Sequence, residues 1–283
     1  MALESGVAAL VLLSAVLHAG WNAVVKVTGD RLLALATVMT TGSALALCAL
    51  PFVPIPAPAS WPYLVLSMAL HAAYQTALLL SYRVGDLSHV YPIARGVAPL
   101  PVAALAAGFA GEALSGLQIG ALLLVSLGIA SLALAHGWPT RETLKPVGFA
   151  VLTGLVIGSY SFVDGQGVRL AGSARSYIVW QFALAGLPIF TVAVLRRRRR
   201  VLDYLGESGR SGVLAGLFAS VAYAIVMWAL GQGGMANVVA LRETSVIFGA
   251  LFGARLLGEP FGGRRVTAAA VVATGVMLLN LAR

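Results

Sequence analysis

The sequence predicts an all-α integral membrane protein in which ten transmembrane helices form two inverted five-helix repeats. Hydrophobic residues make up 59% of the 283-residue chain and charged residues only 10%, whereas soluble domains carry about 25% charged residues. The mean hydropathy is +0.91, and apolar runs of the roughly 20 residues that cross a bilayer recur along the chain. Lipid offers no partner for backbone amides, and these runs are too long for barrel strands, so each is predicted to be a helix.

An internal repeat supports the division into two halves. Arg95 is followed by Glu112, and Arg242 is followed by Glu259, in each case 17 residues later. The two copies are offset by 147 residues. Each half therefore carries one arginine inside an apolar run and one glutamate at the end of that run.

The repeat predicts two structural units, residues 1–137 and residues 138–283. Gly128 and Gly275 share the offset of 147 residues and fall inside the apolar runs that follow the two glutamates. Each half holds five predicted spans. Because five is an odd number, the second half enters the membrane upside down relative to the first.

Ten apolar segments have the length of a spanning helix, and short connections with proline, glycine or charged residues separate them. Five prolines lie between Pro51 and Pro62, and residues 201–210 are predicted to be a charged loop. The connections leave no room for a water-soluble domain. The predicted spans are 5–26, 31–51, 61–82, 88–109, 115–135, 146–167, 174–195, 211–230, 235–256 and 264–282.

The net charge of +9 indicates a topology signal rather than a nucleic-acid surface. Five of the nineteen basic residues form the run Arg196–Arg200 directly after an apolar span, where basic clusters meet lipid headgroups. Loops and span ends on that side hold 14 basic residues, and the other side holds Arg169, Arg175 and Arg283. For a bacterial cytoplasmic membrane, the positive-inside rule predicts that the Arg196–Arg200 loop is cytoplasmic and that both termini are outside.

Arg95 and Arg242 are the residues least compatible with lipid. An arginine at the centre of a transmembrane helix costs about 2.5 to 3.5 kcal/mol on insertion scales, so both side chains are expected to face protein or water. Because the two helices run oppositely, one arginine approaches the membrane centre from each side and flanks a central cavity. Guanidinium groups match carboxylate and phosphate geometry, which predicts an anionic substrate group there. The alternative is a structural ion pair with a carboxylate such as Asp164 or Glu243.

Other polar and aromatic side chains within the spans are predicted to line the same cavity, although hydrogen bonds between helices would explain them equally well. Asp164 and Glu243 are candidates for proton coupling, because burial favours the protonated form of a carboxyl group. An uncoupled facilitator is equally open. The candidates for substrate binding, besides the two arginines, are His18, Trp21, Asn22, Tyr74, Gln75, Tyr91 and Tyr160.

Three patterns predict structural roles. Pro92, Pro99 and Pro101 interrupt the fourth span and suit a cavity wall or a kink. Glu112 and Glu259 end their spans at the surface and are expected to cap the following helices. Glycine pairs of the GxxxG type let helices approach closely; they are Gly116/Gly120, Gly154/Gly158, Gly212/Gly216 and Gly249/Gly253.

No catalytic, metal or cofactor site is predicted. Residues 206–209 read GESG and match the GxSG of rhomboid-type serine proteases, but they lie in the predicted charged loop without a histidine placed as a base. The sequence contains no HExxH, P-loop or dinucleotide fingerprint. Cys48 is the only cysteine, so no intrachain disulfide is expected. Residues 1–17 lack the basic region of a cleavable signal peptide.

The two five-span halves, the Trp21–Asn22 pair and the two Gly-Glu dipeptides resemble the EamA-type drug/metabolite transporters. The stretch Leu241–Phe248, continuing to Gly258–Glu259 and Gly275, is similar to the second half of that family. The resemblance covers essentially the whole chain and implies a transporter fold whose members export amino acids, other metabolites and drugs. The opening HAGWNAVVK resembles a subgroup associated with phosphonate utilisation. The resemblance also implies cytoplasmic termini, opposite to the charge count.

These observations predict a secondary transporter that works by alternating access and moves a small anionic or zwitterionic metabolite, such as an amino acid, an organic acid or a phosphonate. Export is the direction that the resemblance implies. The expected partners are a small-molecule substrate and the lipid bilayer, without nucleic acid, and a homodimer is left open. One alternative is an exporter of drugs or lipophilic cations, against which the paired arginines count. The other is a membrane scaffold or sensor that transports nothing.

Overall fold

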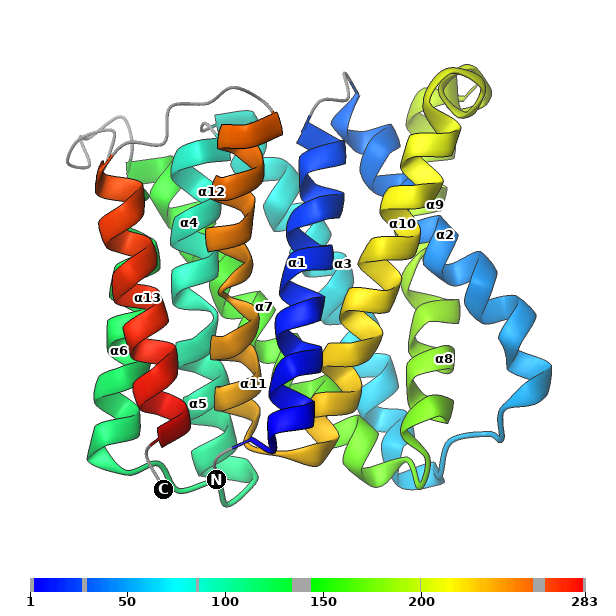
Figure 1. Ribbon diagram of the computed structural model, residues 1–283. Helices are drawn as coiled ribbons and strands as arrows, with labels where there is room; N and C mark the ends of the chain where they lie inside the picture. Colours follow the sequence, from blue (N-terminus) through cyan, green and yellow to red (C-terminus); the bar gives the residue numbers. More distant parts are fainter. Residues whose placement is uncertain are drawn as a thin grey trace.

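The computed structural model describes residues 3–26, 30–84, 87–133, 144–198, 200–256 and 263–281, which form helices and turns with no strand among them. The α-helices are α1 (Ser5–Lys26), α2 (Arg31–Ala49), α3 (Trp61–Val84), α4 (Leu87–Val97), α5 (Pro99–Phe109), α6 (Gly116–Ser131), α7 (Leu144–Leu170), α8 (Ala174–Ala185), α9 (Leu187–Arg197), α10 (Arg200–Gln232), α11 (Met235–Arg242), α12 (Ser245–Leu256) and α13 (Gly263–Leu281). Two 3-10 turns, η1 (Leu50–Phe52) and η2 (Pro58–Ser60), lie between α2 and α3. Most helices stand side by side with roughly parallel axes, and both chain ends lie at the same end of the bundle (Figure 1).

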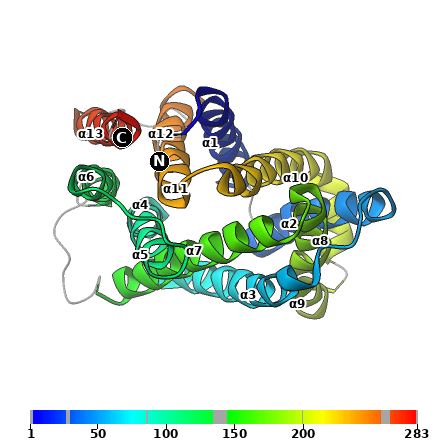
Figure 2. The ribbon, with the colours of Figure 1, turned by 90° about the horizontal axis from the view of Figure 1, so that it is seen from below.

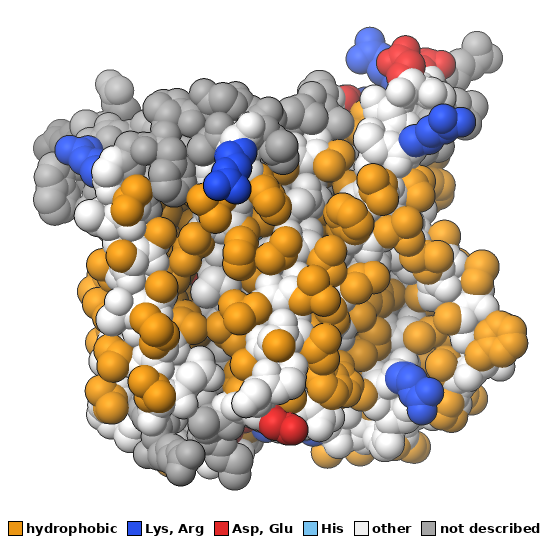
Figure 3. All heavy atoms as spheres, viewed as in Figure 1, with side chains coloured by type: hydrophobic (Ala, Val, Ile, Leu, Met, Phe, Trp, Pro, Cys, Tyr) orange, Lys and Arg blue, Asp and Glu red, His pale blue; other side chains and the backbone are white. Residues whose placement is uncertain are grey.

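The outside of the bundle is apolar. Large side chains such as Phe109, Leu127 and Leu195 are mostly exposed, and in Figure 3 hydrophobic atoms cover the middle of the face while charged side chains lie toward its two ends. A water-soluble monomer rarely exposes so large an apolar surface. Among the described residues, seven segments are long and apolar enough to cross a membrane: Ser5–Val25, Leu32–Phe52, Tyr91–Phe109, Leu144–Leu170, Ala174–Arg197, Gly206–Gln232 and Met235–Gly253. Two shorter apolar helices are Gly116–Ser131 and Val266–Leu281.

Three predicted spans are broken helices in the structure. Span 88–109 divides into α4 and α5 at Ala98, directly before Pro99, which has no N–H for the preceding turn. Span 174–195 divides into α8 and α9 at Gly186, close to a proline in the first turn of α9. Span 235–256 divides into α11 and α12 without a proline. The prolines predicted only the first of these breaks.

The prediction of a charged loop at residues 201–210 is wrong. These residues belong to α10, which begins at Arg200 and includes the GESG sequence. Loss of hydrophobicity marks the membrane boundary rather than the end of a helix, because charged residues are acceptable helix formers in water. Asp203 in the first turn also interacts favourably with the helix dipole.

Helices from the two halves of the chain pack on each other. The most extensive contacts join α1 to α10, α3 to α7 and α6 to α13, and the end-on view shows the same neighbours (Figure 2). In addition, α7 packs on α4 and α5, and α1 packs on α11 and α12. Two of the broken helices, α4–α5 and α11–α12, therefore lie against the first helix of the opposite half.

The glycine pairs differ in what they contact. A Cβ added at Gly154 or Gly158 would lie 2.6 Å or 2.7 Å from the backbone oxygen of Ala94 or Ala98, respectively. A Cβ at Gly212 or Gly216 would lie close to the side chain of Thr37 or Thr41 on α2, whereas a Cβ at Gly116, Gly120 or Gly249 would have no atom within 4 Å. Close packing is thus confirmed where α7 passes the α4–α5 break.

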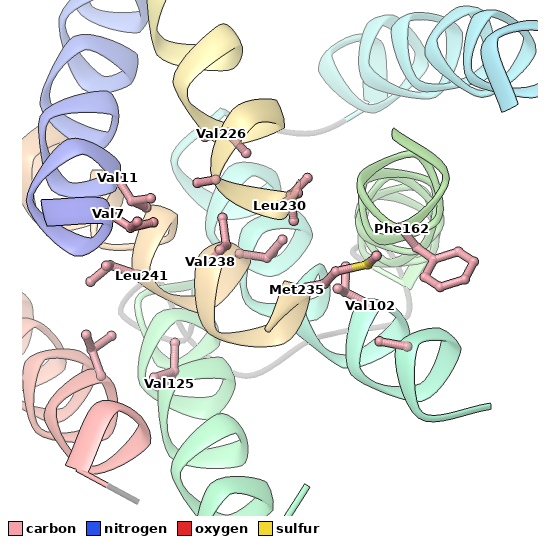
Figure 4. Close-up of a cluster of buried hydrophobic side chains, with 14 of the residues drawn as sticks. Val7, Val11, Val102, Val125, Phe162, Val226, Leu230, Met235, Val238 and Leu241 are labelled. Atoms are coloured by element: carbon pink, nitrogen blue, oxygen red, sulfur yellow. The ribbon is translucent and has the colours of Figure 1, made fainter. Parts of the chain in front are cut away.

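The main hydrophobic cluster surrounds α11. Figure 4 shows Val238 and Leu241 of α11 among side chains of α1, α6 and α10, with Met235 close to Val102. All eight residues of α11 are buried. Apolar packing therefore surrounds the short helix that ends at Arg242.

Candidate functional site

Arg95 and Glu243 form a buried ion pair at the centre of the molecule. Nε of Arg95 lies 2.7 Å from Oε2 of Glu243, with 4% and 0% of the two side chains exposed. Nη2 of Arg95 also donates to Oγ of Ser245 at 3.3 Å. Arg95 Nε and the two Glu243 oxygens make no further hydrogen bond among the described residues. The sequence left open an ion pair of the arginines with Asp164 or Glu243, and the structure contains the pair of Arg95 with Glu243.

Arg242 is equally buried but differently placed. It is 5% exposed, and its guanidinium carbon lies 5.2 Å from the ring centroid of Tyr223, within the range of a cation–π contact. Its Nη1 has no hydrogen-bond partner in the part of the chain that the structure describes. No ion pair between described residues includes Arg242. The arginine centre, which we define as Arg95, Arg242 and Glu243, thus contains two guanidinium groups and one carboxylate.

Both arginines lie next to breaks in their helices. Arg95 is three residues before Ala98, and Arg242 is the last residue of α11. In Figure 1, α4 lies above α5 whereas α11 lies below α12, so the two broken helices run in opposite directions. The ends of the four short helices therefore meet inside the bundle, and they bring Arg95 and Arg242 together with Glu243.

The predicted residues of α1 form one local group beside the arginines. His18 is buried and within electrostatic range of both Arg95 and Arg242. Nε1 of Trp21 donates to Nδ1 of His18 at 3.2 Å, and the two rings meet edge to face. The amide of Asn22 donates to the carbonyl of His18, so Asn22 is engaged by its own helix.

The predicted aromatic residues lie around the same centre. The ring of Tyr91 is 6.0 Å from the guanidinium carbon of Arg95. Tyr74 contacts Tyr160 edge to face at 5.6 Å and is within electrostatic range of both arginines. Gln75 is buried on α3. Of the predicted binding residues, His18, Tyr74, Tyr91 and Tyr160 lie within electrostatic range of Arg95.

Asp164 belongs to a second polar centre. Its carboxylate, which is fully buried, accepts hydrogen bonds from the hydroxyls of Tyr177 at 3.0 Å and Tyr223 at 2.5 Å. Nε2 of His71 lies 3.2 Å from its Oδ2, and the His71 ring stacks on Tyr160. The structural alternative in which Asp164 pairs with an arginine is wrong, because the partners of Asp164 among the described residues are His71, Tyr177 and Tyr223.

Sequence reasoning missed Tyr177 and Tyr223 as site residues. They lie on α8 and α10, at no regular spacing from Asp164, and their hydroxyls inside apolar runs were the only available signal. His71, by contrast, lies one helical turn from the predicted Tyr74 and Gln75. The described residues contain no group of three histidine, cysteine or acidic side chains that could hold a metal ion.

Glu112 was predicted to cap the helix that follows it, α6, and this prediction is wrong. Ser115 and Gln118 form the capping box of the following helix, α6. Glu112 instead accepts a hydrogen bond from the backbone N–H of Met235, the first residue of α11, at 2.9 Å. The repeat counterpart, Glu259, lies outside the described residues.

A family match and a shared fold relate this chain to known proteins. Residues 144–281 match the EamA-like transporter family. No curated protein matches the sequence. One solved crystal structure aligns over 98% of this chain and 97% of its own, with a TM-score of 0.77 at 17% sequence identity, which shows a shared fold.

Residues 144–281 are therefore similar to the EamA-like transporter family, and the chain as a whole shares the fold of that solved structure. Members of that family are transporters rather than enzymes. Together with the apolar helices, the match identifies a multi-pass membrane protein. The resemblance to the phosphonate-associated subgroup stays a prediction.

Proposed function

We propose that this chain, with its EamA-like transporter domain, is a secondary transporter for a small anionic or zwitterionic metabolite, and that the anionic group of the substrate binds between Arg242 and Arg95. A carboxylate or phosphonate fits this position, because a guanidinium group presents parallel N–H donors to two oxygens. Arg242 is the main contact for the anionic group, because Arg95 is already paired with Glu243.

The observation that carries the proposal is the unbalanced charge of the arginine centre. Two guanidinium groups face one carboxylate, and Nη1 of Arg242 has no hydrogen-bond partner among the described residues. A buried charge without a partner costs several kcal/mol, and most buried polar groups are satisfied. One bound monoanion would neutralise the excess charge and fill the open donor position.

The same charge counts against a lipophilic cation as substrate. A cation at this site would lie beside Arg242 and Arg95 in a poorly screened interior, where like charges repel strongly. A scaffold or sensor without a ligand would need no uncompensated guanidinium group. The anionic substrate is therefore the function that this centre supports best.

Two inverted repeats of five spans each are part of the proposal. The repeat offset relates α1 to α7 and α3 to α10, so the α1–α10 and α3–α7 contacts are equivalent. The opposite directions of the two broken helices (Figure 1) fit the same relationship. In such transporters the substrate site lies where the repeats meet, and discontinuous helices form it. Rocking of one repeat against the other would then expose the arginine centre to each side in turn.

Orientation follows from the charged end of the bundle. The described arginines of the 196–200 run lie at the end opposite to both termini (Figure 1). By the positive-inside rule, we place this end in the cytoplasm and the termini outside, in a bacterial inner membrane.

Counterflow in proteoliposomes tests the function. Vesicles loaded with an unlabelled compound take up the labelled compound only if the protein exchanges it, and no ion gradient is needed. The panel is lactate, alanine, methylphosphonate and the lipophilic cation tetraphenylphosphonium. We expect exchange of one or more of the first three, and a loss of about tenfold or more in Arg242→Gln, because a hydrogen bond to a charged group contributes about 1.5–3 kcal/mol.

The matched control is Arg255→Gln, since Arg255 is an exposed arginine near the end of α12. It should exchange the substrate at the wild-type rate. Thermal melts of all variants would establish that they remain folded. Exchange of tetraphenylphosphonium alone, or full exchange by folded Arg242→Gln, contradicts the proposed site.

A further inference from the structure

His71 and Asp164 form a buried pair that the proposed anion site does not use. Nε2 of His71 lies 3.2 Å from Oδ2 of Asp164, and 12% of the histidine side chain but none of the carboxylate is exposed. The carboxylate receives two further hydrogen bonds, from the hydroxyls of Tyr177 and Tyr223. With a neutral histidine the pair carries one negative charge, and with an imidazolium it carries none.

Tyr223 connects this pair to the arginine centre. Its hydroxyl donates to Oδ2 of Asp164 at 2.5 Å, and its ring lies 5.2 Å from the guanidinium carbon of Arg242. The charges of Asp164 and Arg242 both act on Tyr223. One aromatic ring therefore separates the uncompensated positive charge of the anion site from the buried carboxylate.

We propose that the His71–Asp164 pair is a proton-binding site, and that it is coupled through Tyr223 to anion binding at Arg242. The inference rests on the proposed function. The added proton resides on the imidazole of His71 and leaves an imidazolium opposite the Asp164 carboxylate. No other bond forms or breaks, and the charge of the pair changes from −1 to 0.

The sign of the coupling follows from charge. In the empty protein, the positive charge of Arg242 stabilises the nearby negative pair. A bound monoanion neutralises Arg242, so the pair is left as a buried negative charge and binds a proton more readily. By linkage, a bound proton strengthens anion binding by the same factor. Anion and proton therefore move together in the same direction, without net charge transfer.

This coupling has a consequence for the direction of transport. Where the proton gradient points into the cell, an anion that moves with a proton is taken up rather than exported. The resemblance to drug/metabolite transporters implies export, so the sign of the response to a pH gradient separates the two expectations.

Ionisable groups lie on several of the helices that pack around Asp164. Its partners on α3, α8 and α10 are His71, Tyr177 and Tyr223. On α7 itself, Tyr160 stacks on His71 and is within electrostatic range of Arg95 on α4. Other charged or ionisable groups on the surrounding helices include Tyr63 and Tyr74 on α3, Tyr91 on α4, Arg175 on α8, Arg242 at the end of α11, and Lys145 and Arg169 on α7. Arg169 is paired with Glu112, whereas no ion pair between described residues includes Arg242, which contacts Tyr223.

Glu243 is the weaker of the two predicted proton sites. It touches Arg95 at 2.7 Å, so a proton bound to Glu243 would remove the negative charge that balances Arg95. Asp164 instead faces a histidine, which is the side chain whose charge changes most readily near neutral pH.

The experiment compares two measurements on the same proteoliposomes. Counterflow at equal pH on both sides reports the anion site alone. Accumulation of labelled lactate, alanine or methylphosphonate under an imposed pH gradient reports the coupling. We expect wild type to accumulate substrate on the alkaline side, and Asp164→Asn and His71→Gln to retain counterflow while losing gradient-driven accumulation.

A matched pair of variants tests the role of Tyr223. Tyr223→Phe and Tyr177→Phe each remove one hydroxyl donor from Asp164, but only Tyr223 also contacts Arg242. Lactate affinity in detergent is measured at about pH 6 and about pH 8, a range in which its carboxylate stays ionised. Wild type should bind about tenfold more tightly at the lower pH, within the roughly 5- to 150-fold range of typical coupling. Tyr223→Phe should reduce that ratio more than Tyr177→Phe does.

The outcomes distinguish the two proposals. Absence of counterflow for every compound contradicts the proposed function. Counterflow without any effect of the pH gradient, or with accumulation on the acidic side, overturns the coupled proton site while the anion site stands. Unchanged gradient-driven accumulation in folded Asp164→Asn also overturns it, because a purely structural Asp164 would leave the coupling intact.

Discussion

Glu112 and Arg169 form a 2.7 Å ion pair that holds three helix ends together at the end of the bundle where both chain termini lie. The second carboxylate oxygen of Glu112 accepts from the N–H of Met235, while Arg169 also donates to the carbonyls of Leu230 and Gly233. The segment between α5 and α6 is thereby joined to the ends of α7 and α10 and to the start of α11. This contact fixes the short helix that carries Arg242.

Replacement of Glu112 should therefore destabilise the protein in two steps. Glu112→Gln removes the ion pair but keeps an acceptor for Met235, at a cost of up to about 1 kcal/mol for a partly exposed pair. Glu112→Ala also removes the cap of α11 and should cost about 1 kcal/mol more. Thermal melts in detergent rank the variants by melting temperature. Glu207→Gln, on the exposed start of α10, is the control and should not change the melting temperature. Equal melting temperatures for all three variants would contradict a structural role of this contact.

Glu243→Gln should lower stability and strengthen anion binding. The carboxylate is fully buried against Arg95, and removing one partner of a buried ion pair costs about 3–5 kcal/mol. The same change frees Arg95 from an internal competitor, so that the anion gains a second guanidinium group. Melting temperature and lactate affinity are the two measurements.

The double variant Arg95→Gln/Glu243→Gln tests the energetic coupling. Because neither charge is then left alone, it should be more stable than the sum of the single changes predicts, by about 0.5–3 kcal/mol. If the two single changes in stability add up to that of the double variant, the 2.7 Å contact contributes no interaction energy between Arg95 and Glu243.

Gly128→Val should disrupt the packing of α6 on α13. A Cβ at Gly128 would lie 2.9 Å from Cγ1 of Val271, and a Cβ at Gly275 would lie 2.7 Å from Cγ2 of Val125, so the two glycines face each other's helix reciprocally. Overpacking of this kind costs about 1–3 kcal/mol, which a thermal melt detects. Gly116→Ala is the control, because its Cβ would meet nothing within 4 Å, and it should leave stability unchanged or raise it slightly.

The predicted orientation can be read from single cysteines. In a Cys48→Ser background, Glu4→Cys lies near the chain terminus and Glu207→Cys lies at the opposite end of the bundle, on the exposed start of α10. A membrane-impermeant maleimide added to intact cells should label position 4 and should label position 207 only after the membrane is opened. The reverse pattern would place the arginine run outside and refute the orientation that the charge count predicts.

Much of the architecture could be predicted because length and hydrophobicity identify membrane helices. The helix from Ser5 to Lys26 matches its predicted span, and the proline-marked break beside Arg95 is present. The break at Glu243 and Thr244 was not predictable. No proline or glycine lies there, and the turn is held by local hydrogen bonds such as that from the Thr244 hydroxyl to the carbonyl of Leu241.

The candidate site was predictable in its residues but not in its pairings. Arginine and aspartate inside apolar runs must face protein or water because lipid cannot solvate them, and this rule alone selects Arg95, Arg242 and Asp164. Which carboxylate pairs with which cation depends on contacts between residues 93 to 148 positions apart in the chain. Helical spacing carries no information over such a separation.

By itself, the sequence determined that the chain is a bundle of apolar helices with an internal repeat and with charges that must be buried, because hydrophobicity, spacing and solvation cost are local properties of each segment. Only the tertiary structure decided that Glu243 neutralises Arg95, that Asp164 pairs with His71 and that Tyr223 lies between Asp164 and Arg242. The physical reason is that these contacts arise where helices from both halves cross. Their energies depend on the mutual packing of whole helices rather than on any one stretch of chain.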